Sequence, residues 1–176
     1  PQTPRAVGSY DELLAASDID AIYVPLPTGL RREWVIRAAE AGKHVLCEKP
    51  CAPSLADLRA MTDACRANGV QFMDGVMFMH SLRLPLLRRA IDDAERLGTL
   101  RRIGIQFSFC GPEAFLESDI RLHSELEPQG CLGDLGWYCI RQILWTVEGR
   151  MPTEVTGRIL TEGANRTSPG KVPVEF

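Results

Sequence analysis

The stretch from Asp20 to Cys51 constrains the fold of this 176-residue chain more than any other. It begins with a short apolar run, Ala21 to Val24, and closes with a second one, His44 to Cys47. Between them, residues 31–41 carry apolar side chains at helical spacing, and Gly42 follows where helices commonly end in a left-handed residue. Strand, helix and strand in this order predict a βαβ unit, whose strands are parallel and joined by a right-handed crossover.

The segments that follow the two predicted strands are candidates for a ligand site. Open parallel sheets bind ligands beyond the carboxyl ends of their strands. Residues 25–28, Pro-Leu-Pro-Thr, follow the first strand, and Glu48-Lys49-Pro50 follows the second. We therefore expect both segments on one rim of the sheet. Lys49, fixed by the proline after it, would project into the crevice and bond a hydroxyl or carbonyl oxygen. A solvated lysine paired with Glu48 is the other interpretation, and spacing alone does not choose between them.

A second motif spans residues 130–141, Gly-Cys-Leu-Gly-Asp-Leu-Gly-Trp-Tyr-Cys-Ile-Arg. Asp134 and Tyr138 are four residues apart, so they would share one face of a helix. A carboxylate one turn from a phenol suits proton transfer, with the carboxylate orienting a substrate. A phenol has an ordinary pKa of about 10, so it needs a nearby cation to act as a base at neutral pH, and Lys49 would supply one. The competing interpretation is a capping aspartate and a tyrosine in an aromatic core with Trp137 and Trp145.

Both motifs resemble those of the Gfo/Idh/MocA family, nicotinamide-dependent sugar and polyol oxidoreductases named after glucose–fructose oxidoreductase and inositol dehydrogenase. Residues 42–50, Gly-Lys-His-Val-Leu-Cys-Glu-Lys-Pro, are similar to the family's hallmark at a strand end. The resemblance covers essentially the whole chain. It implies that Lys49 contacts substrate near the nicotinamide and that Glu48 lies at the cofactor ribose, and it thereby favours a functional Lys49.

Tyr138 stands where many members of that family have a histidine that handles the proton. Relatives similar to glucose–fructose oxidoreductase and dimeric dihydrodiol dehydrogenase also have a tyrosine there. The resemblance implies that Tyr138 takes or gives the hydroxyl proton, assisted by Lys49, while Asp134 orients the substrate. We expect these three residues to converge on one crevice between two domains. Three weaker candidates for the substrate side are Arg121, His80 and Trp137, although a lone histidine is at least as often structural.

The resemblance also implies a site for NAD or NADP. The expected cofactor-binding residues are Pro25, Leu26, Thr28, Arg31, Glu48, Lys49 and Pro50. Thr28 and Arg31 depart from the asparagine and histidine that the family often has beside the cofactor. Arg31 could reach a cofactor phosphate, but we favour a solvated residue in the first turn of the helix.

No Gly-x-Gly turn occurs in the sequence. A complete dinucleotide-binding domain begins with a strand and such a turn, which holds the pyrophosphate at a helix N-terminus. We therefore expect the C-terminal half of a Rossmann-type parallel sheet domain, of class α/β, followed by part of an α+β domain with an open, mostly antiparallel sheet. The expected domains are residues 1–80 for NAD(P) binding and residues 81–176 for substrate binding and oligomerisation.

Local patterns predict the remaining elements. Helices are expected over residues 7–17, 54–67, 85–97 and 132–147, and strands over residues 70–76, 103–109 and 154–160. Ser9 and Ser54, each three residues before an acidic residue, are expected to cap the first two helices. Apolar and polar residues alternate at 103–109, which leaves one face to solvent or a partner, so we expect a homo-oligomer through the C-terminal sheet. Residues 110–130 lack periodicity, and residues 162–176 are rich in turn formers and are expected not to close a sheet.

Composition argues against several classes of function. A net charge of −3 without a basic cluster gives nucleic-acid binding no support. No apolar run approaches the roughly 20 residues of a membrane span, and the N-terminus has no signal-peptide core, so we expect a cytoplasmic protein. The six cysteines include no Cys-x-x-Cys pair and the three histidines are scattered. We expect no metal site, and thiols that are reduced and largely buried.

The leading interpretation is an NAD(P)-dependent oxidoreductase that transfers hydride between nicotinamide and a carbinol carbon of a sugar, polyol or diol. A catalytically silent binding or scaffold protein is the first rival. It would be expected to lose Lys49, Asp134 or Tyr138, and all three are present. A hydrolase with Cys47 or Cys51 as nucleophile is the second, but the sequence indicates no neighbouring base for it.

Overall fold

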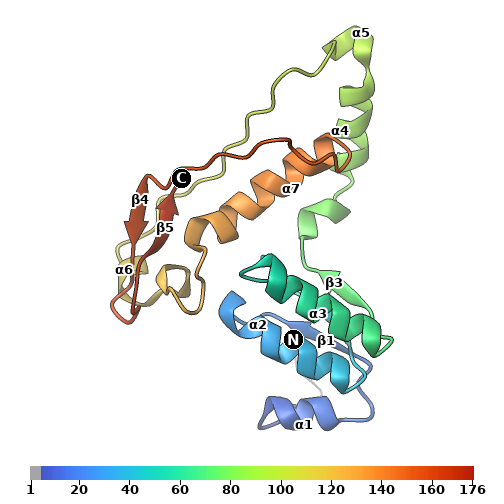
Figure 1. Cartoon of the computed structure of the whole chain (residues 1–176), viewed down its shortest axis with the longest axis vertical. Coiled ribbons are helices and arrows are strands. Elements are labelled where there is room, and N and C mark those ends of the chain that lie inside the picture. Colours follow the sequence, from blue (N-terminus) through green and yellow to red (C-terminus); the bar gives the residue numbers. More distant parts are fainter. Residues whose placement is uncertain (1–4) are drawn as a thin grey trace. The chain divides into compact units, whose positions relative to one another are not determined.

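A computed structural model describes residues 5–176 and divides into two compact units that meet in the sequence at Gly75 and Val76. In Figure 1 the first unit runs from blue to the green of β3, and the second runs from green to red. Among residues 5–176, none of the helices has the length and apolar character needed to cross a membrane.

The first unit is a βαβαβ segment preceded by a short helix. In chain order its elements are α1 (Tyr10–Ala15), β1 (Ala21–Val24), α2 (Thr28–Glu40), β2 (His44–Cys47), α3 (Leu55–Ala67) and β3 (Phe72–Asp74). The strands are parallel in the order β1-β2-β3, with Val24 beside Cys47 and Cys47 beside Asp74. The predicted βαβ unit and parallel sheet are confirmed.

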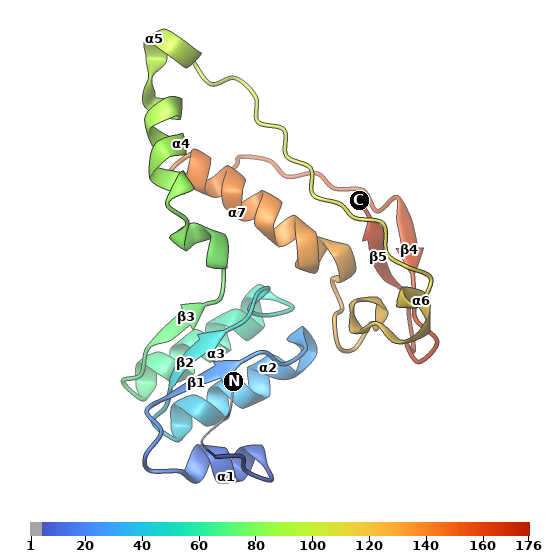
Figure 2. The ribbon, with the colours of Figure 1, turned by 180° about the vertical axis from the view of Figure 1, so that it is seen from behind.

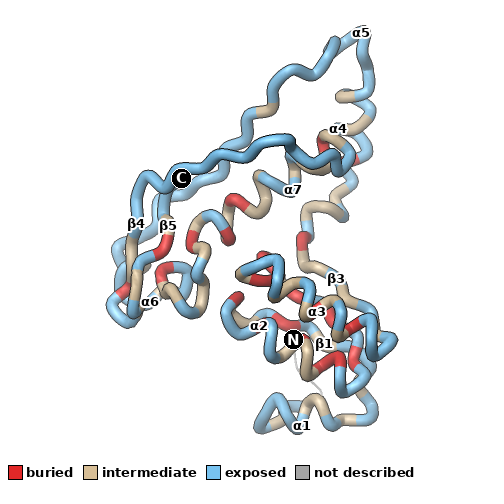
Figure 3. The backbone as a smooth tube through the Cα atoms, viewed as in Figure 1, coloured by how far each residue is buried: buried red, intermediate tan, exposed pale blue. Residues whose placement is uncertain are grey.

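Helices α2 and α3 pack on the same face of this sheet, as the two opposite views show (Figures 1 and 2). The side chains of Val24, Val45 and Cys47 share one face of the sheet and are buried, and so are Val35 of α2 and Met61 of α3. Buried residues accordingly gather in the first unit where the helices meet the strands (Figure 3). The register partners Tyr23, Leu46 and Met73 lie on the opposite face and are exposed.

The ends of these helices follow the signals in the sequence. Ser9 accepts a hydrogen bond from the backbone N–H of Glu12, and Ser54 accepts one from that of Asp57, so both predicted helix starts are confirmed. Gly42 has a φ of 73°, a left-handed conformation that suits the residue after a helix. Helix α2 begins at Thr28, three residues before the predicted start, because Pro27 ends the extended segment.

The second unit contains short helices and one hairpin. Its elements are η1 (Met77–His80), α4 (Arg83–Asp92), α5 (Ala94–Leu97), α6 (Phe115–Ser118), η2 (Ile120–Leu122), η3 (Leu132–Gly136), α7 (Trp137–Thr146), β4 (Thr161–Gly163) and β5 (Val172–Glu175). Strands β4 and β5 pair antiparallel. The predicted fold class, part of a parallel Rossmann-type sheet followed by a separate antiparallel sheet, is confirmed.

Several element boundaries in this unit differ from the sequence predictions. Residues 103–109 and 154–160 form no strand in the structure, so both predictions are wrong here. Alternation alone does not make a strand, because a strand needs a neighbouring backbone, and neither segment has a strand partner among residues 5–176. The predicted helix 85–97 is divided at Asp93, whose side chain caps α5. Residues 162–176, expected not to close a sheet, contribute to the hairpin.

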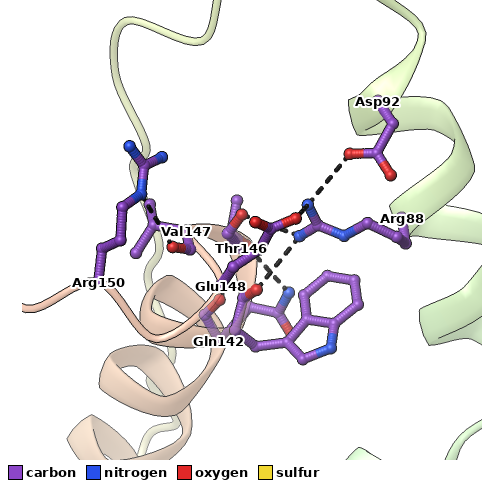
Figure 4. A network of polar contacts seen from close by, with 8 residues as sticks. Arg88, Asp92, Gln142, Thr146, Val147, Glu148 and Arg150 are labelled. Carbon is purple, nitrogen blue, oxygen red and sulfur yellow. Dashed lines mark hydrogen bonds and ion pairs between the residues drawn. The ribbon is translucent and has the colours of Figure 1, made fainter.

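Arg88 of α4 ties that helix to the C-terminal end of α7 (Figure 4). Its Nη2 donates to the carbonyl oxygens of Trp145 and Thr146 at 3.2 and 2.8 Å. Its guanidinium carbon lies 4.7 Å from the centroid of the Trp145 ring, and Nη1 pairs with Asp92 and Glu148. The last carbonyls of a helix lack the intrahelical partners of the earlier ones. Arg88 gives the carbonyl of Thr146 a donor and adds one to that of Trp145, which also accepts from the backbone N–H of Glu148.

Candidate active site

The carboxyl ends of β1 and β2 form the rim that the sequence predicted. The backbone N–H of Glu48 donates to the carbonyl oxygen of Val24 at 3.1 Å, and that of Gly75 to the carbonyl oxygen of Cys47 at 2.7 Å. These bonds hold the segments after the three strands side by side. The segment 25–28 leads from β1 into α2, and Thr28, the first residue of α2, is buried. Both candidate cofactor segments therefore share one edge of the sheet.

Arg31 lies beneath this rim rather than in solvent. It is 5% exposed. Its Nε donates to the carbonyl oxygen of Leu26 at 2.6 Å, and its Nη1 donates to those of Glu48, at 2.8 Å, and Pro50. The interpretation of Arg31 as a solvated residue is therefore wrong. The two loops turn carbonyl oxygens inward that no strand pairs with, and the buried guanidinium satisfies them.

Glu48 is oriented by two hydrogen bonds. Its Oε1 accepts from the Tyr23 hydroxyl at 2.8 Å, and its Oε2 accepts from the backbone N–H of Lys49 at 3.1 Å. The bond to Glu48 raises the pKa of Tyr23, because it stabilises the neutral phenol beside a carboxylate. Lys49 is half-buried, and its peptide bond to Pro50 is cis. The carboxylate is thus held at the rim next to Lys49.

The cysteines near the rim are packed inside the first unit. Cys47 and Cys51 are 0% and 2% exposed, and Cys65 is buried as well. The hydrogen bond between the two cysteines raises the pKa of the Cys51 thiol, as does burial, and lowers that of Cys47. A nucleophilic cysteine is partly exposed to its substrate, and neither thiol is, so the hydrolase alternative gains no support. All six cysteines are free, and Cys110 is exposed. In the part of the chain that the structure describes, no group of three histidine, cysteine or acidic residues is placed to hold a metal ion.

In the second unit, Asp134 and Arg121 form an ion pair. The Nε of Arg121 lies 2.9 Å from Oδ2 of Asp134, and its Nη1 lies 3.4 Å from Oδ1 of Asp119. Partial burial lowers the pKa of the Arg121 guanidinium, but the carboxylates of Asp134 and Asp119 outweigh it, and the net shift is upward. The charged form of Arg121 is therefore favoured. The arginine that the sequence placed on the substrate side and the candidate substrate-orienting aspartate are brought together.

The helix that carries Asp134 and Tyr138 is not α-helical throughout. Residues Leu132–Gly136 form a π turn, and α7 begins only at Trp137. The sequence predicted one α-helix over residues 132–147. Turns of the π type are rare and occur often at functional sites. The turn places the carboxylate and the phenol on two successive turns of different geometry.

Aromatic rings surround Tyr138. Its ring centroid lies 5.9 Å from that of Phe78 and 5.7 Å from that of Phe107. The Nε1 atom of Trp137 is buried and has no hydrogen-bond partner among the described residues. A buried indole N–H usually bonds to something, so this atom is a donor suited to a bound ligand. His80, at the end of η1, is exposed.

Three residues that support these sites escaped the sequence analysis. Tyr23 holds Glu48, and Asp119 holds Arg121. Asn165 is 5% exposed, and its Nδ2 donates to the carbonyl oxygen of Asp119 at 2.8 Å. Its Oδ1 accepts from the backbone N–H of Thr167, a local turn that the spacing of these two residues could have suggested. Lys49 belongs to the first unit and Asp134 and Tyr138 to the second, and their expected convergence stays a prediction.

Two family models together match nearly the whole chain. The model described as "Oxidoreductase family, NAD-binding Rossmann fold" matches residues 2–76. The model described as "GFO/IDH/MocA C-terminal domain" matches residues 86–175. The first match covers the parallel sheet and its rim, and the second covers α7 with Asp134 and Tyr138.

Individual relatives are named as sugar oxidoreductases. D-xylose 1-dehydrogenase (NADP(+)) 2 of Haloferax volcanii is 40% identical over 138 residues, which make up 78% of this chain and 41% of that protein. The dTDP-3,4-didehydro-2,6-dideoxy-alpha-D-glucose 3-reductase of Streptomyces violaceoruber is 37% identical over 136 residues, 77% of this chain and 38% of that protein. The chain therefore spans about two fifths of the length of these relatives.

A solved structure with a similar fold is that of KijD10, a 3-ketoreductase from Actinomadura kijaniata in complex with NADP and TDP-benzene. It matches with a TM-score of 0.66 and 30% sequence identity, over 80% of this chain and 42% of that one. The aldose-aldose oxidoreductase from Caulobacter crescentus matches with a TM-score of 0.64 and 31% identity, over 79% of this chain and 40% of that one.

Proposed function

The chain belongs to the Gfo/Idh/MocA family of oxidoreductases, and we propose that it is part of an NAD(P)-dependent enzyme acting on a sugar, polyol or diol. Hydride would pass between the nicotinamide and a carbinol carbon of the substrate. The matched family models and the names of the relatives support this class of reaction. The substrate and the choice between NAD and NADP are part of the proposal.

One observation carries the proposal. The segment 25–28 and the Glu48-Lys49-Pro50 segment lie together at the carboxyl edge of a parallel sheet, where open α/β sheets bind their ligands. The donor set of this rim fits a nicotinamide riboside. Glu48 offers carboxylate oxygens to ribose hydroxyls, and its own orientation is fixed by Tyr23. Pro25, Leu26, Thr28, Lys49 and Pro50 complete the proposed cofactor contacts.

The residues of the second unit would handle the substrate and its proton. When bound, the nicotinamide supplies the carbon that accepts or donates hydride. Tyr138 exchanges a proton with the substrate hydroxyl, and Lys49 provides the positive charge that favours the phenolate. Asp134, already paired with Arg121, orients the substrate through its carboxylate. The unpartnered Nε1 of Trp137 supports a substrate contact there, and His80 is a further contact of the same proposal.

The division of labour and the assembly are part of the same proposal. Residues 1–80 would form part of the NAD(P)-binding domain, and residues 81–176 part of the domain for substrate binding and oligomerisation. Ile105, Phe107 and Phe109 are between 38% and 53% exposed, which supports an interface through that region. A monomer in sedimentation of the full-length protein at micromolar concentration would contradict the homo-oligomer. A cytoplasmic setting is proposed as well, and cell fractionation tests it.

Coenzyme titration of the full-length protein tests the function directly. We expect micromolar binding of NADPH or NADH, and turnover in a panel of aldoses, inositols and vicinal diols. If neither coenzyme binds, the proposed function is wrong. Binding without turnover of any member of the panel, together with no loss of binding in K49M, would favour the catalytically silent protein instead.

The 176-residue chain by itself is a second arm of this experiment. The rim segments 25–28 and 48–50 would contact the nicotinamide side of the coenzyme. A Gly-x-Gly turn that could hold the pyrophosphate does not occur in these 176 residues. Two or three charge-assisted hydrogen bonds are worth about 1.5–3 kcal/mol each. We therefore expect this chain to bind on the order of 10³-fold more weakly than the full-length protein, or worse. Micromolar binding by the chain alone would show that the cofactor site is misplaced.

A further inference from the structure

Arg31 differs from every other arginine of its helix. Arg32, on the same helix, is exposed and pairs with Asp57, and Arg37 is half-buried and pairs with Asp11 and Glu33. Arg31 is 5% exposed, and the hydrogen bonds of its side chain go to backbone carbonyl oxygens. Burying a guanidinium is costly unless its donors are satisfied. The three carbonyl oxygens supply the hydrogen bonds that offset this cost.

The three carbonyl oxygens come from two separate loops. Leu26 lies in the segment after β1, whereas Glu48 and Pro50 lie in the segment after β2. The Nε atom bonds to the first loop and Nη1 to the second. A guanidinium is planar and rigid, so its donors fix the separation of the two loops in a way that a single charge on a flexible stem does not.

Lys49 stands between the two carbonyls that Nη1 holds. The carbonyl oxygens of the residues before and after it, Glu48 and Pro50, both accept from the same nitrogen of Arg31. The backbone N–H of Lys49 is held in turn by the Glu48 side chain. Hydrogen bonds on both sides of Lys49 and at its own N–H therefore fix the conformation of its backbone at the rim.

We propose that Arg31 is a positioning residue that sets the spacing of the two rim loops and the direction in which Lys49 leaves the backbone. This inference rests on the proposed function, since it assigns Arg31 an effect on coenzyme and substrate that it does not touch. Displacing a reacting group by about 1 Å costs on the order of 10²-fold in rate. Loss of the three bonds therefore reduces catalysis even in molecules that remain folded.

The test compares R31M with R32M in the full-length protein. Both variants remove one arginine from the same helix, but only the first removes the bonds to the rim. We expect R31M to raise the coenzyme Kd about tenfold and to lower kcat about 10- to 100-fold on the folded protein. R32M stays within twofold of the wild type. A folded R31M with wild-type kcat and coenzyme Kd would overturn the proposal, because a merely structural residue lowers Tm and leaves both unchanged.

A second variant and a second measurement cover the other outcomes. R31K keeps a buried cation but cannot bond three carbonyl oxygens in a planar fork, so we expect kcat at least fivefold below wild type. If R31M does not fold, R31K decides, and wild-type kinetics in R31K would overturn the proposal. Amide hydrogen exchange over residues 47–52 should be faster in R31K than in wild type and unchanged in R32M. That readout needs no activity, so it separates failure of the positioning role from failure of the proposed function.

Discussion

The two units hold their candidate site residues in different ways. Among residues 5–75 of the first unit, ten apolar side chains are buried, whereas the second unit has four, namely Val76, Leu84, Leu122 and Val172. In the first unit the rim segments directly follow the strands of a sheet that has a buried apolar face. In the second, Asp134 and Arg121 are placed by ion pairs and by the hydrogen bond from Asn165 to the segment before Arg121. The polar contacts of the rim therefore rest on an apolar core, whereas those around Arg121 and Asp134 have few buried apolar side chains behind them.

The largest expected effect separates chemistry from coenzyme binding. Y138F removes the hydroxyl of the second unit that is proposed to exchange the proton, and general acid–base catalysis by one group contributes about 10²- to 10⁴-fold. We expect kcat of the full-length enzyme to fall by that factor, while the coenzyme Kd changes less than threefold. Y10F, a phenol of the first unit in contact with Trp34, is the matched control and should keep wild-type kcat. A loss of less than tenfold in Y138F would remove Tyr138 from the mechanism.

The contrast in packing predicts unequal costs of truncation. Met61 is 0% exposed in the first unit, so M61A should lower the free energy of unfolding by about 2–5 kcal/mol. Ile159 of the second unit is 52% exposed, so I159A should change it by no more than about 0.5 kcal/mol. Urea unfolding of the full-length protein measures both. A large cost at Ile159 would show that this surface is covered in the full protein and would break the comparison.

Asn165 tests whether polar contacts position the candidate residues of the second unit. N165A removes one of the two donors to the Asp119 carbonyl oxygen, which keeps the backbone N–H of Leu122, and leaves the Thr167 N–H without its partner, which costs about 1–3 kcal/mol. Because Asp119 holds Arg121, we also expect a higher KM for substrate with an unchanged coenzyme Kd. R166A, at the exposed neighbouring residue, is the control and should match wild type. An unchanged KM in a destabilised N165A would limit Asn165 to a structural role.

The smallest effect concerns the rim of the first unit at high pH. The pKa of Tyr23 is raised in the folded state by its bond to Glu48. A raised pKa means that the stabilisation is complete below the unfolded value of about 10 and is lost as the pH rises through the higher folded value. The Tm difference between wild type and Y23F should thus be constant from pH 7 to 9 and shrink above about pH 10. A difference that does not change up to pH 11 would contradict the assigned bond.

The parallel sheet and its rim could be predicted because their signals are local. Ser9 and Ser54 cap helices where their spacing to Glu12 and Asp57 indicated, and Gly42 ends α2. Local signals could not decide whether residues 103–109 form a strand, because strand formation depends on a partner backbone distant in sequence. The burial of the Arg31 side chain also depends on tertiary contacts. Its position in the first turn of a helix indicated solvent, but the carbonyls that bury it come from residues up to 19 positions away.

The same limit applies to the candidate site. The i, i+4 spacing of Asp134 and Tyr138 and the Glu-Lys-Pro motif could be read directly. The groups that orient them could not, because Tyr23, Asp119 and Asn165 carry no motif of their own and act across 25, 2 and 46 positions in the sequence. Lys49 and Tyr138 belong to different units, and their approach to each other stays a prediction.

The π turn at Leu132–Gly136 also makes the second unit sensitive to chain length. A π turn contains one residue more than the α-helical turn that it replaces, and each residue of an α-helix turns the chain by about 100°. Deleting a single residue there would restore an unbroken α-helix without replacing any side chain of α7. Asp134 would swing away from Arg121, while Tyr138 would keep its neighbours. In a lineage of such proteins, loss of one codon at this point would therefore break the pair of Asp134 and Arg121 in one step, with the hydrophobic contacts of the helix left as they were.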